Sequence, residues 1–311
     1  MKITHSSITG RIDIAPEVSD ALDAGDAIVA LESTLVAHGL PRPHNLQVAQ
    51  RMQSEIRSAA AVPAMIAIID GRIKIGLSDA ELGSLANDDV LKVTRRDFPS
   101  TISRRLTGAT TVSGTMLAAS WAGIDVLATG GIGGVHRGYR RDVSADLPEL
   151  SRTSMVVVCS GAKAILSLSD TIEWLETYGV PIIGYRTTEL PAFYSRSSGL
   201  RLEVHADTPE DVAHMILIQR ELGLAGSCLV VVPVPQEAAI PLDEVELDIT
   251  EALKIADSEK VRGKAITPFL LEQLVNLTDG ASVRANVALL MNNARVASEI
   301  AVALNSRSRD K

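Results

Sequence analysis

The chain has 311 residues, of which 46% are hydrophobic and 22% are charged, so it is long enough to bury a large core and has the charge content of an ordinary globular protein. Its 38 acidic and 30 basic residues give a formal net charge of −8, which excludes a global positive field and argues against nucleic acid as a partner. We therefore expect a globular protein that does not bind nucleic acid.

Residues 1–18 have neither the apolar core of a signal peptide nor the Arg-rich, acid-poor character of a transit peptide. Apolar stretches such as AVPAMIAII and CLVVVPV are shorter than the ~20 residues that a membrane helix requires. The two cysteines, Cys159 and Cys228, each lie in an apolar run, and a secreted chain of this size would usually have more. These features predict a soluble, cytoplasmic protein with buried free thiols and no membrane partner.

Short runs rich in valine and isoleucine alternate with amphipathic segments, which is typical of an α/β fold with helices on both faces of a central, mostly parallel sheet. The pair Asp70-Gly71 joins two apolar runs and favours a tight type I′ turn, so we also expect a small antiparallel hairpin there. The strands expected in chain order are 27–31, 64–70, 125–130, 155–161, 180–185 and 228–234.

Local signals mark several helices. Ser78 with Glu81 forms a capping-box pattern, and Thr208 is followed by a proline suited to the first helical position, so we expect helices over 79–87 and 209–222. The stretches FLLEQLVNL and SVRANVALLMNNARVASEIAVAL have helical periodicity and predict two helices at the end of the chain. Because no long linker or repeat interrupts the pattern, residues 1–311 are expected to form one α/β domain.

Two glycine-containing segments are candidate anion sites. Glycines follow the strand DVLAT at 130, 131, 133 and 134, where backbone amides could surround a phosphate or could simply form a turn. A dinucleotide fingerprint beginning at Gly131 fails because His136 stands in place of its third glycine, which disfavours a nicotinamide cofactor. The segment GATTVSGTM at 108–116 opens a helix that could bind an anion, and a plain N-cap explains it equally well.

Three residues are candidates for covalent or acid–base chemistry. Lys163 lies just past a buried strand, where a lysine is unexpected without a function or a partner, and Glu32 lies at a similar strand end where it could act as a general acid. Lys92 in KVTRRDF could bind phosphate or face water. The alternative for Lys163 is a solvated lysine at a strand end that has no functional role.

The segment HRGYRRDVSADL contains His136, Arg137, Asp142, Ser144 and Asp146. Its two carboxylates near a histidine could hold a hard cation through oxygen ligands, mostly by way of water. Each of these residues taken singly is more typical of a solvated surface.

Many segments in one order together resemble the pseudouridine-5′-phosphate glycosidase family, also called pseudouridylate synthases and related to the indigoidine synthase A-like proteins. The resemblance covers almost the whole chain. It rests on ALESTLVAHGLPRP, AAVPAMIAIIDGRIKIGL, KVTRRDF, GATTVSGTM, LATGGIGGVHRG, DVSADLPEL, VVVCSGAKAIL, VPIIGYRT, LPAFYSR, GKAITPFLL and RANVALLMNNA.

The resemblance implies a lyase that reversibly cleaves pseudouridine 5′-phosphate into uracil and ribose 5-phosphate. It implies that Lys163 is the covalent lysine and Glu32 the proton donor, and that a divalent ion, usually Mn²⁺ and one per subunit, lies at Asp142. The loop between Gly138 and Asp142 is shorter than in some relatives. A homotrimer is also implied. The implied substrate contacts are Lys92, the Val112 backbone, His136, Ser144, Ala145, Asp146 and Asn286.

The chemistry explains why such a substrate needs a lysine. Pseudouridine joins C1′ of ribose to C5 of uracil through carbon, so protonating a leaving nitrogen cannot assist cleavage. A partly neutral lysine that forms an imine with the opened sugar divides the difficult step into two easier ones. Another imine-forming sugar-phosphate lyase or aldolase, and a non-catalytic nucleotide-phosphate sensor, are the alternatives. An RNA-modifying enzyme is disfavoured by the acidic charge balance and the 3% aromatic content.

Overall fold

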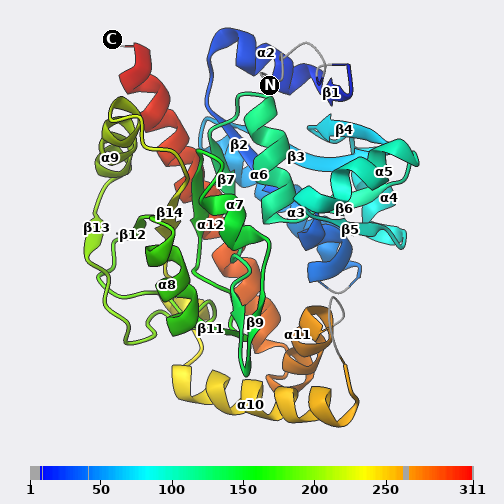
Figure 1. The fold of residues 1–311 in the computed structure, drawn as a ribbon, viewed down its shortest axis with the longest axis vertical. Coiled ribbons are helices and arrows are strands. Elements are labelled where there is room, and N and C mark those ends of the chain that lie inside the picture. Colours follow the sequence, from blue (N-terminus) through cyan, green and yellow to red (C-terminus); the bar gives the residue numbers. More distant parts are fainter. Residues whose placement is uncertain (1–7, 9, 41, 262–265, 310–311) are drawn as a thin grey trace.

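The computed structural model describes residues 8, 10–40, 42–261 and 266–309, and the beginning of the segment GKAITPFLL lies outside these ranges. An 11-stranded sheet forms the centre of the fold, with helices on both of its faces (Figure 1). Its main path runs in the order β1-β4-β3-β2-β7-β10-β14-β12-β13, and β5 and β6 join it through β3. The strands are β1 Ile12–Ile14, β2 Ile28–Glu32, β3 Val62–Ile69, β4 Arg72–Ile75, β5 Leu91–Val93, β6 Gly108–Thr110, β7 Val126–Ala128, β10 Val156–Cys159, β12 Ile182–Tyr185, β13 Val204–Ala206 and β14 Cys228–Val231.

The predicted α/β class is confirmed, because every strand pair from β3 across to β13 is parallel. Burial explains the continuous apolar runs: all five residues of β2 and all four of β10 are buried. The helices are α2 Pro16–Ala24, α3 His44–Ser58, α4 Asp79–Asn87, α5 Phe98–Ser103, α6 Val112–Trp121, α7 Asp146–Leu150, α8 Leu168–Thr177, α9 Pro209–Glu221, α10 Leu242–Ser258, α11 Ile266–Leu277 and α12 Ala281–Arg309, with the short turns η1 Leu35–Gly39, η2 Arg95–Asp97 and η3 Gln236–Ala238.

Local sequence signals determine several boundaries as expected. Asp70 and Gly71 adopt φ of 50° and 75°, and β3 pairs antiparallel with β4 on either side of them, which confirms the predicted hairpin. The capping box at Ser78 is formed in both directions and begins α4 at Asp79. Both cysteines are buried free thiols, and burial raises the pKa of each to about 12.

Several elements lie outside what the sequence patterns predicted, among them β1, β5, β6, β13, α2, α3, α5, α7 and α8. A second, three-stranded antiparallel sheet has the order β11-β8-β9, with β8 Val135–His136, β9 Tyr139–Val143 and β11 Leu166–Ser167. It turns the polar segment around His136 and Asp142 into strands and pairs it with residues just after Lys163. The long helix α10 was also not among the expected helices.

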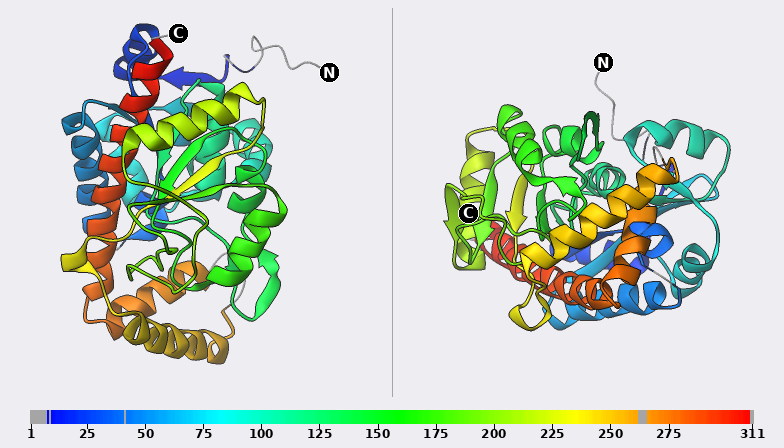
Figure 2. Two further views of the ribbon diagram at one scale, coloured as in Figure 1. Left: turned by 90° about the vertical axis from the view of Figure 1, so that its left-hand side faces the viewer. Right: turned by 90° about the horizontal axis from the view of Figure 1, so that it is seen from below.

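The C-terminal helix α12 is the central helix of the core. It contacts α9 and α3 as well as the strands β7, β10 and β2, and it extends along the molecule in Figure 2. By length and composition it is the one helix among the described residues that could cross a membrane, but 61% of its most apolar window is buried inside the protein. Its hydrophobicity is therefore accounted for by packing.

Candidate active site

The carboxyl ends of β2, β7 and β10 meet at one edge of the sheet, which is where ligands bind in folds of this kind. Glu32 ends β2, Thr129 follows β7, and Lys163 follows β10. Two adjoining cavities lie at this edge: an outer one of about 390 Å³ and an inner one of about 50 Å³. Glu32, Thr34, Lys92 and Lys163 line both cavities, so the two form one continuous site.

The structure brings all of the predicted site residues to this site. The outer cavity is lined by the segments around α6 and β9, and the inner one by η1, α11 and α12. Besides the shared residues, the predicted positions on the outer side are Val112, His136, Asp142, Ser144, Ala145 and Asp146, and the one on the inner side is Asn286.

Glu32 is held by two hydroxyl groups that the sequence reasoning did not identify. The residue as a whole is 6% exposed. Thr129 Oγ1 donates to Oε1 at 2.5 Å, and Thr34 Oγ1 donates to Oε2. The two threonines therefore fix the orientation of a buried acid at the wall of the site.

Asn293 of α12 supports the backbone next to Glu32, and the sequence analysis did not identify this residue either. Its side chain is fully buried. Its Nδ2 donates to the carbonyl of Thr129 at 2.9 Å and to Ser160 Oγ at 3.1 Å. This one side-chain amide therefore links the residues that follow β7 and β10. An asparagine inside the apolar run LLMNNARVA is the signal that could have revealed it.

Lys163 is presented by a tight turn after β10. Gly161 has a φ of 86°, and a Cβ there would lie 2.6 Å from the carbonyl oxygen of Pro191, so only glycine fits. The Lys163 amide donates to the carbonyl of Ile132 at 3.0 Å. The side chain is half-buried, and within the described residues no hydrogen bond or ion pair of its Nζ is seen. A lysine without a fixed carboxylate partner is suited to act as a nucleophile.

In the glycine-rich turn after β7, the amide of Gly133 is used for an internal hydrogen bond. The buried carboxylate of Asp146 accepts from the amide of Gly133 at 2.8 Å and from the amide of Ser113 at 2.9 Å. A Cβ at Gly133 would lie 2.1 Å from Ser144 Oγ, which explains the glycine. Of the two alternatives at this turn, a phosphate site and a plain turn, a phosphate is excluded at the amide of Gly133, because Asp146 already accepts its hydrogen bond.

The first turn of α6 retains one amide for a ligand. The amide of Ser113 donates to Asp146, and that of Gly114 donates to Thr111 Oγ1 at 3.3 Å. For the amide of Val112, no partner is present in the described part of the chain. This N–H lines the outer cavity at the positive end of a helix, together with Lys92, and an anion would be stabilised there.

The two histidines of the site are kept neutral by their surroundings. Burial lowers the pKa of His136, the charge of Lys92 lowers it further, and the nearby Asp142 carboxylate opposes the shift. Burial is also the main cause that lowers the pKa of His38 on η1, and the Lys92 charge again adds to it. His38 lines the inner cavity and was not identified from the sequence.

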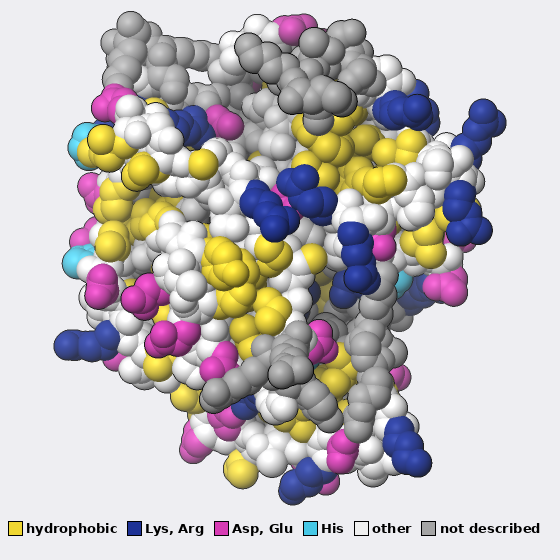
Figure 3. Space-filling view, viewed as in Figure 1, with side chains coloured by type: hydrophobic (Ala, Val, Ile, Leu, Met, Phe, Trp, Pro, Cys, Tyr) yellow, Lys and Arg dark blue, Asp and Glu magenta, His cyan; other side chains and the backbone are white. Residues whose placement is uncertain are grey.

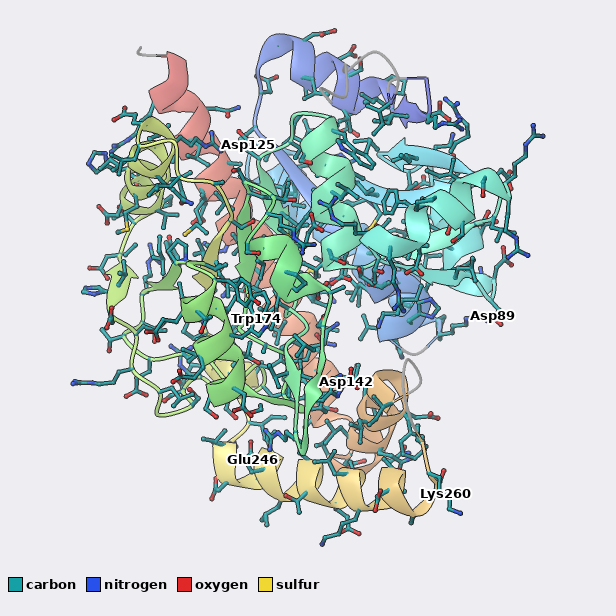
Figure 4. All side chains as sticks on the ribbon, in the orientation of Figure 1. Asp89, Asp125, Asp142, Trp174, Glu246 and Lys260 are labelled. Atoms are coloured by element: carbon teal, nitrogen blue, oxygen red, sulfur yellow. The ribbon has the colours of Figure 1, made fainter. Side chains whose placement is uncertain are left out.

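The residues around Asp142 fit a hydrated metal ion better than a closed cage. Asp142 is exposed on β9 (Figure 4), and His136 lies within its electrostatic reach. Among the described residues there is no group of three or more His, Cys, Asp or Glu side chains that could hold a metal ion. A divalent ion bound by one carboxylate with most of its ligands from water is compatible with this arrangement.

Arg137 connects the site to α10. Its guanidinium donates to both oxygens of Glu246, at 2.5 and 2.8 Å, and to the carbonyls of Ala164 and Leu166 at 2.9 and 3.1 Å. Glu246 is labelled on α10 in Figure 4. These bonds fix α10 against the segment that follows Lys163. In Figure 3, Lys and Arg side chains gather at the centre and on the right of the face, and Asp and Glu side chains are more frequent on its left and below.

Comparison with known proteins agrees with this geometry. A family model described as "Indigoidine synthase A like protein" matches residues 17–303. The chain belongs to this family. Relatives named pseudouridine-5′-phosphate glycosidase are 49% identical over 297 residues in Caldanaerobacter subterraneus (94% of this chain and 97% of the relative) and 52% identical over 299 residues in Chloroflexus aurantiacus (94% and 98%).

Two solved structures have the same fold. The indigoidine synthase A-like protein from Thermotoga maritima has a TM-score of 0.87 and 38% identity, covering 94% of this chain and 96% of its own. The prealnumycin C-glycosynthase AlnA, in complex with ribulose 5-phosphate, has a TM-score of 0.89 and 35% identity, covering 96% and 99%. The similarity to these structures thus covers nearly the whole fold, including the elements that form the site.

Proposed function

We propose that the chain is a pseudouridine-5′-phosphate glycosidase that reversibly cleaves the C1′–C5 bond to give uracil and ribose 5-phosphate. The observation that carries this proposal is the position of Glu32 and Lys163 at the junction of the two cavities. Relatives with this name, about half identical over nearly the full length, support it. So does the neighbour that holds a pentose phosphate, ribulose 5-phosphate.

In the proposed reaction, Lys163 acts as a nucleophile and Glu32 as a proton donor. Glu32 gives a proton to the ring oxygen O4′ as the Lys163 amine bonds to C1′ and the C1′–O4′ bond breaks. The new ammonium returns its proton to Glu32, which then protonates C5 of uracil. The nitrogen lone pair then forms the C=N bond of the iminium as the C1′–C5 bond breaks. The electron pair of that bond stays with the uracil ring, whose C5 now carries the new hydrogen. Water adds to the iminium, the proton released in this hydrolysis returns to the Glu32 carboxylate, and ribose 5-phosphate and the free amine are formed.

The remaining residues bind and orient the substrate in this scheme. The Val112 amide and Lys92 bind the 5′-phosphate in the outer cavity, alongside Ser144 and Ala145. Asp146 acts indirectly, because its carboxylate holds the first turn of α6 and the Gly133 turn in place. Thr34 and Thr129 orient the Glu32 carboxyl group.

We also propose that Asp142 binds Mn²⁺, one ion per subunit, with His136 and water close by. When bound, this ion would supply positive charge that organises the phosphate and nearby water. A homotrimer, which rests on the family resemblance, and a cytoplasmic location, which rests on the two buried free thiols, complete the proposal. Light scattering of the purified protein tests the trimer.

The deciding experiment is incubation with pseudouridine 5′-phosphate and manganese, followed by chromatographic detection of uracil. Release of uracil together with ribose 5-phosphate supports the glycosidase. An imine with ribose 5-phosphate without release of uracil would instead favour an aldolase or another sugar-phosphate lyase. The Lys163→Ala variant should release no uracil, and loss of activity in an Ala variant of the exposed Glu237 would indicate an unspecific effect.

A further inference from the structure

His38 has a ring nitrogen that the described protein leaves without a partner. Its Nε2 is buried and forms no hydrogen bond among the described residues. A contact between the ring and the Val90 backbone favours its protonated form. When the neutral ring has its proton on Nδ1, Nε2 presents a lone pair.

Burial and a nearby cation keep this ring neutral. Both lower the pKa of His38, and the cation is Lys92. A neutral ring with this tautomer presents Nε2 as an acceptor of hydrogen bonds. A buried acceptor without a partner costs folding free energy, so it calls for a ligand donor or another explanation.

The position of His38 identifies which part of a ligand it faces. It lines the inner cavity on η1, a π-helical turn of a kind that is frequent at functional sites. The phosphate is expected on the outer side, where the Val112 amide lies, and the reacting carbon at the junction beside Lys163. The base must therefore extend into the inner cavity.

The inner cavity has walls suited to a flat heterocycle. The apolar side chains there are Leu35, Phe193, Leu271 and Leu290. The polar groups on the side away from the reacting residues are His38 and Asn286. Apolar walls with a few polar groups that fix orientation are typical of such pockets.

We propose that His38 Nε2 accepts a hydrogen bond from a ring N–H of the departing pyrimidine-dione base and so determines specificity for uracil. The proposal rests on the proposed glycosidase function. It assigns His38 to the base and not to the sugar phosphate. Substitution by leucine leaves an N–H of the bound base unpaired and removes the contact without adding charge.

The test uses the reverse reaction, in which uracil and ribose 5-phosphate combine. His38→Leu should raise the KM for uracil about 10- to 100-fold, since an unpaired buried group costs roughly one to two decades in affinity. Borohydride trapping of ribose 5-phosphate on Lys163 should stay at the wild-type level, which also shows that the variant is folded. His38→Gln, whose amide oxygen can reach the position of Nε2, should recover part of the loss, and His44→Leu, at an exposed histidine, should behave as wild type.

Each other outcome has a definite meaning. An unchanged KM for uracil in His38→Leu overturns the proposal. Equal losses in the uracil reaction and in the trapping of ribose 5-phosphate also overturn it, because they indicate a structural or sugar-phosphate role. If the wild-type protein neither releases uracil from pseudouridine 5′-phosphate nor traps ribose 5-phosphate, the proposed glycosidase function itself is wrong. This result differs from those that overturn only the role of His38.

Discussion

Replacing Asn293 with alanine should destabilise the fold and disturb Glu32 at the same time. The side chain is fully buried, and its Nδ2 donates to the Thr129 carbonyl at 2.9 Å and to Ser160 Oγ at 3.1 Å. The substitution leaves two buried polar groups unpaired, at about 1–3 kcal/mol each. We therefore expect the free energy of unfolding to fall by about 2–6 kcal/mol.

Urea denaturation followed by fluorescence or circular dichroism measures this loss. With a slope of about 3 kcal/mol per molar urea for a chain of this size, the midpoint should fall by about 1 M. The neighbouring Asn292→Ala is the matched control, because its Nδ2 makes a single long contact of 3.4 Å to the carbonyl of Pro233 and its Oδ1 accepts from the exposed Arg295. It should shift the midpoint by a few tenths of a molar at most.

Activity should follow the same order. Thr129 donates through Oγ1 to Glu32 while its carbonyl is held by Asn293, so release of that carbonyl loosens the proton donor. Turnover should therefore fall in Asn293→Ala and stay near wild type in Asn292→Ala under conditions where both are folded. Equal urea midpoints for the two variants would refute this reasoning.

Three further predictions concern the ligands and the pH. Unphosphorylated pseudouridine should have a kcat/KM about 100-fold lower than its 5′-phosphate, because charge-assisted contacts from Lys92 and the Val112 amide are lost; comparable values would contradict their role. Exhaustive chelation should lower activity and Mn²⁺ should restore it, whereas Asp142→Ala should be inactive and insensitive to the metal; an identical metal response in Asp142→Ala and Glu237→Ala would refute the assignment. Burial lowers the pKa values of His38 and His136, so as the pH falls below about 6.5 these groups take up protons in the unfolded state before they do so in the folded state. The free energy of unfolding should therefore decrease in this pH range. A His38→Gln, His136→Gln double variant should show a smaller decrease between pH 7.5 and 5.5, and an unchanged decrease would rule out these two groups as its source.

Features that depend on neighbours in the sequence were predicted well. The continuous apolar runs gave the positions of β2, β10 and β14 because buried parallel strands are apolar on both faces. The capping box at Ser78 and the turn at Asp70-Gly71 are contained within a few residues, so their outcome does not depend on the rest of the fold.

Features that depend on distant partners were missed. The strand β8 pairs with β11, about thirty residues later in the chain, so the polar segment around His136 gave no local sign of a sheet. Asn293 and Thr129 are 164 positions apart, and Arg137 and Glu246 are 109 apart. The sequence left open whether the amide of Gly133 binds a phosphate or belongs to a plain turn, because the carboxylate that accepts from it comes from another segment.

The prediction of the candidate site depended more on the family resemblance than on the spacing of residues in the sequence. Lys163 and Glu32 were each plausible alone, but nothing local indicated that the ends of β10 and β2 lie at one cavity. The threonines that hold Glu32 and the ring of His38 are ordinary residues in sequence and acquire a role only through burial and contact.

Borohydride trapping tests the central claim most directly, namely that Lys163 forms an imine with C1′ of the opened sugar. Ribose 5-phosphate exists partly as the open aldehyde, so its reaction with the protein in the presence of borohydride should leave a stable adduct, which peptide mass spectrometry should place on Lys163. Lys163→Ala and Lys163→Arg should give neither adduct nor turnover, since alanine has no amine and a guanidinium stays protonated. A label on Lys92 instead, or near wild-type turnover of Lys163→Ala, would contradict the mechanism.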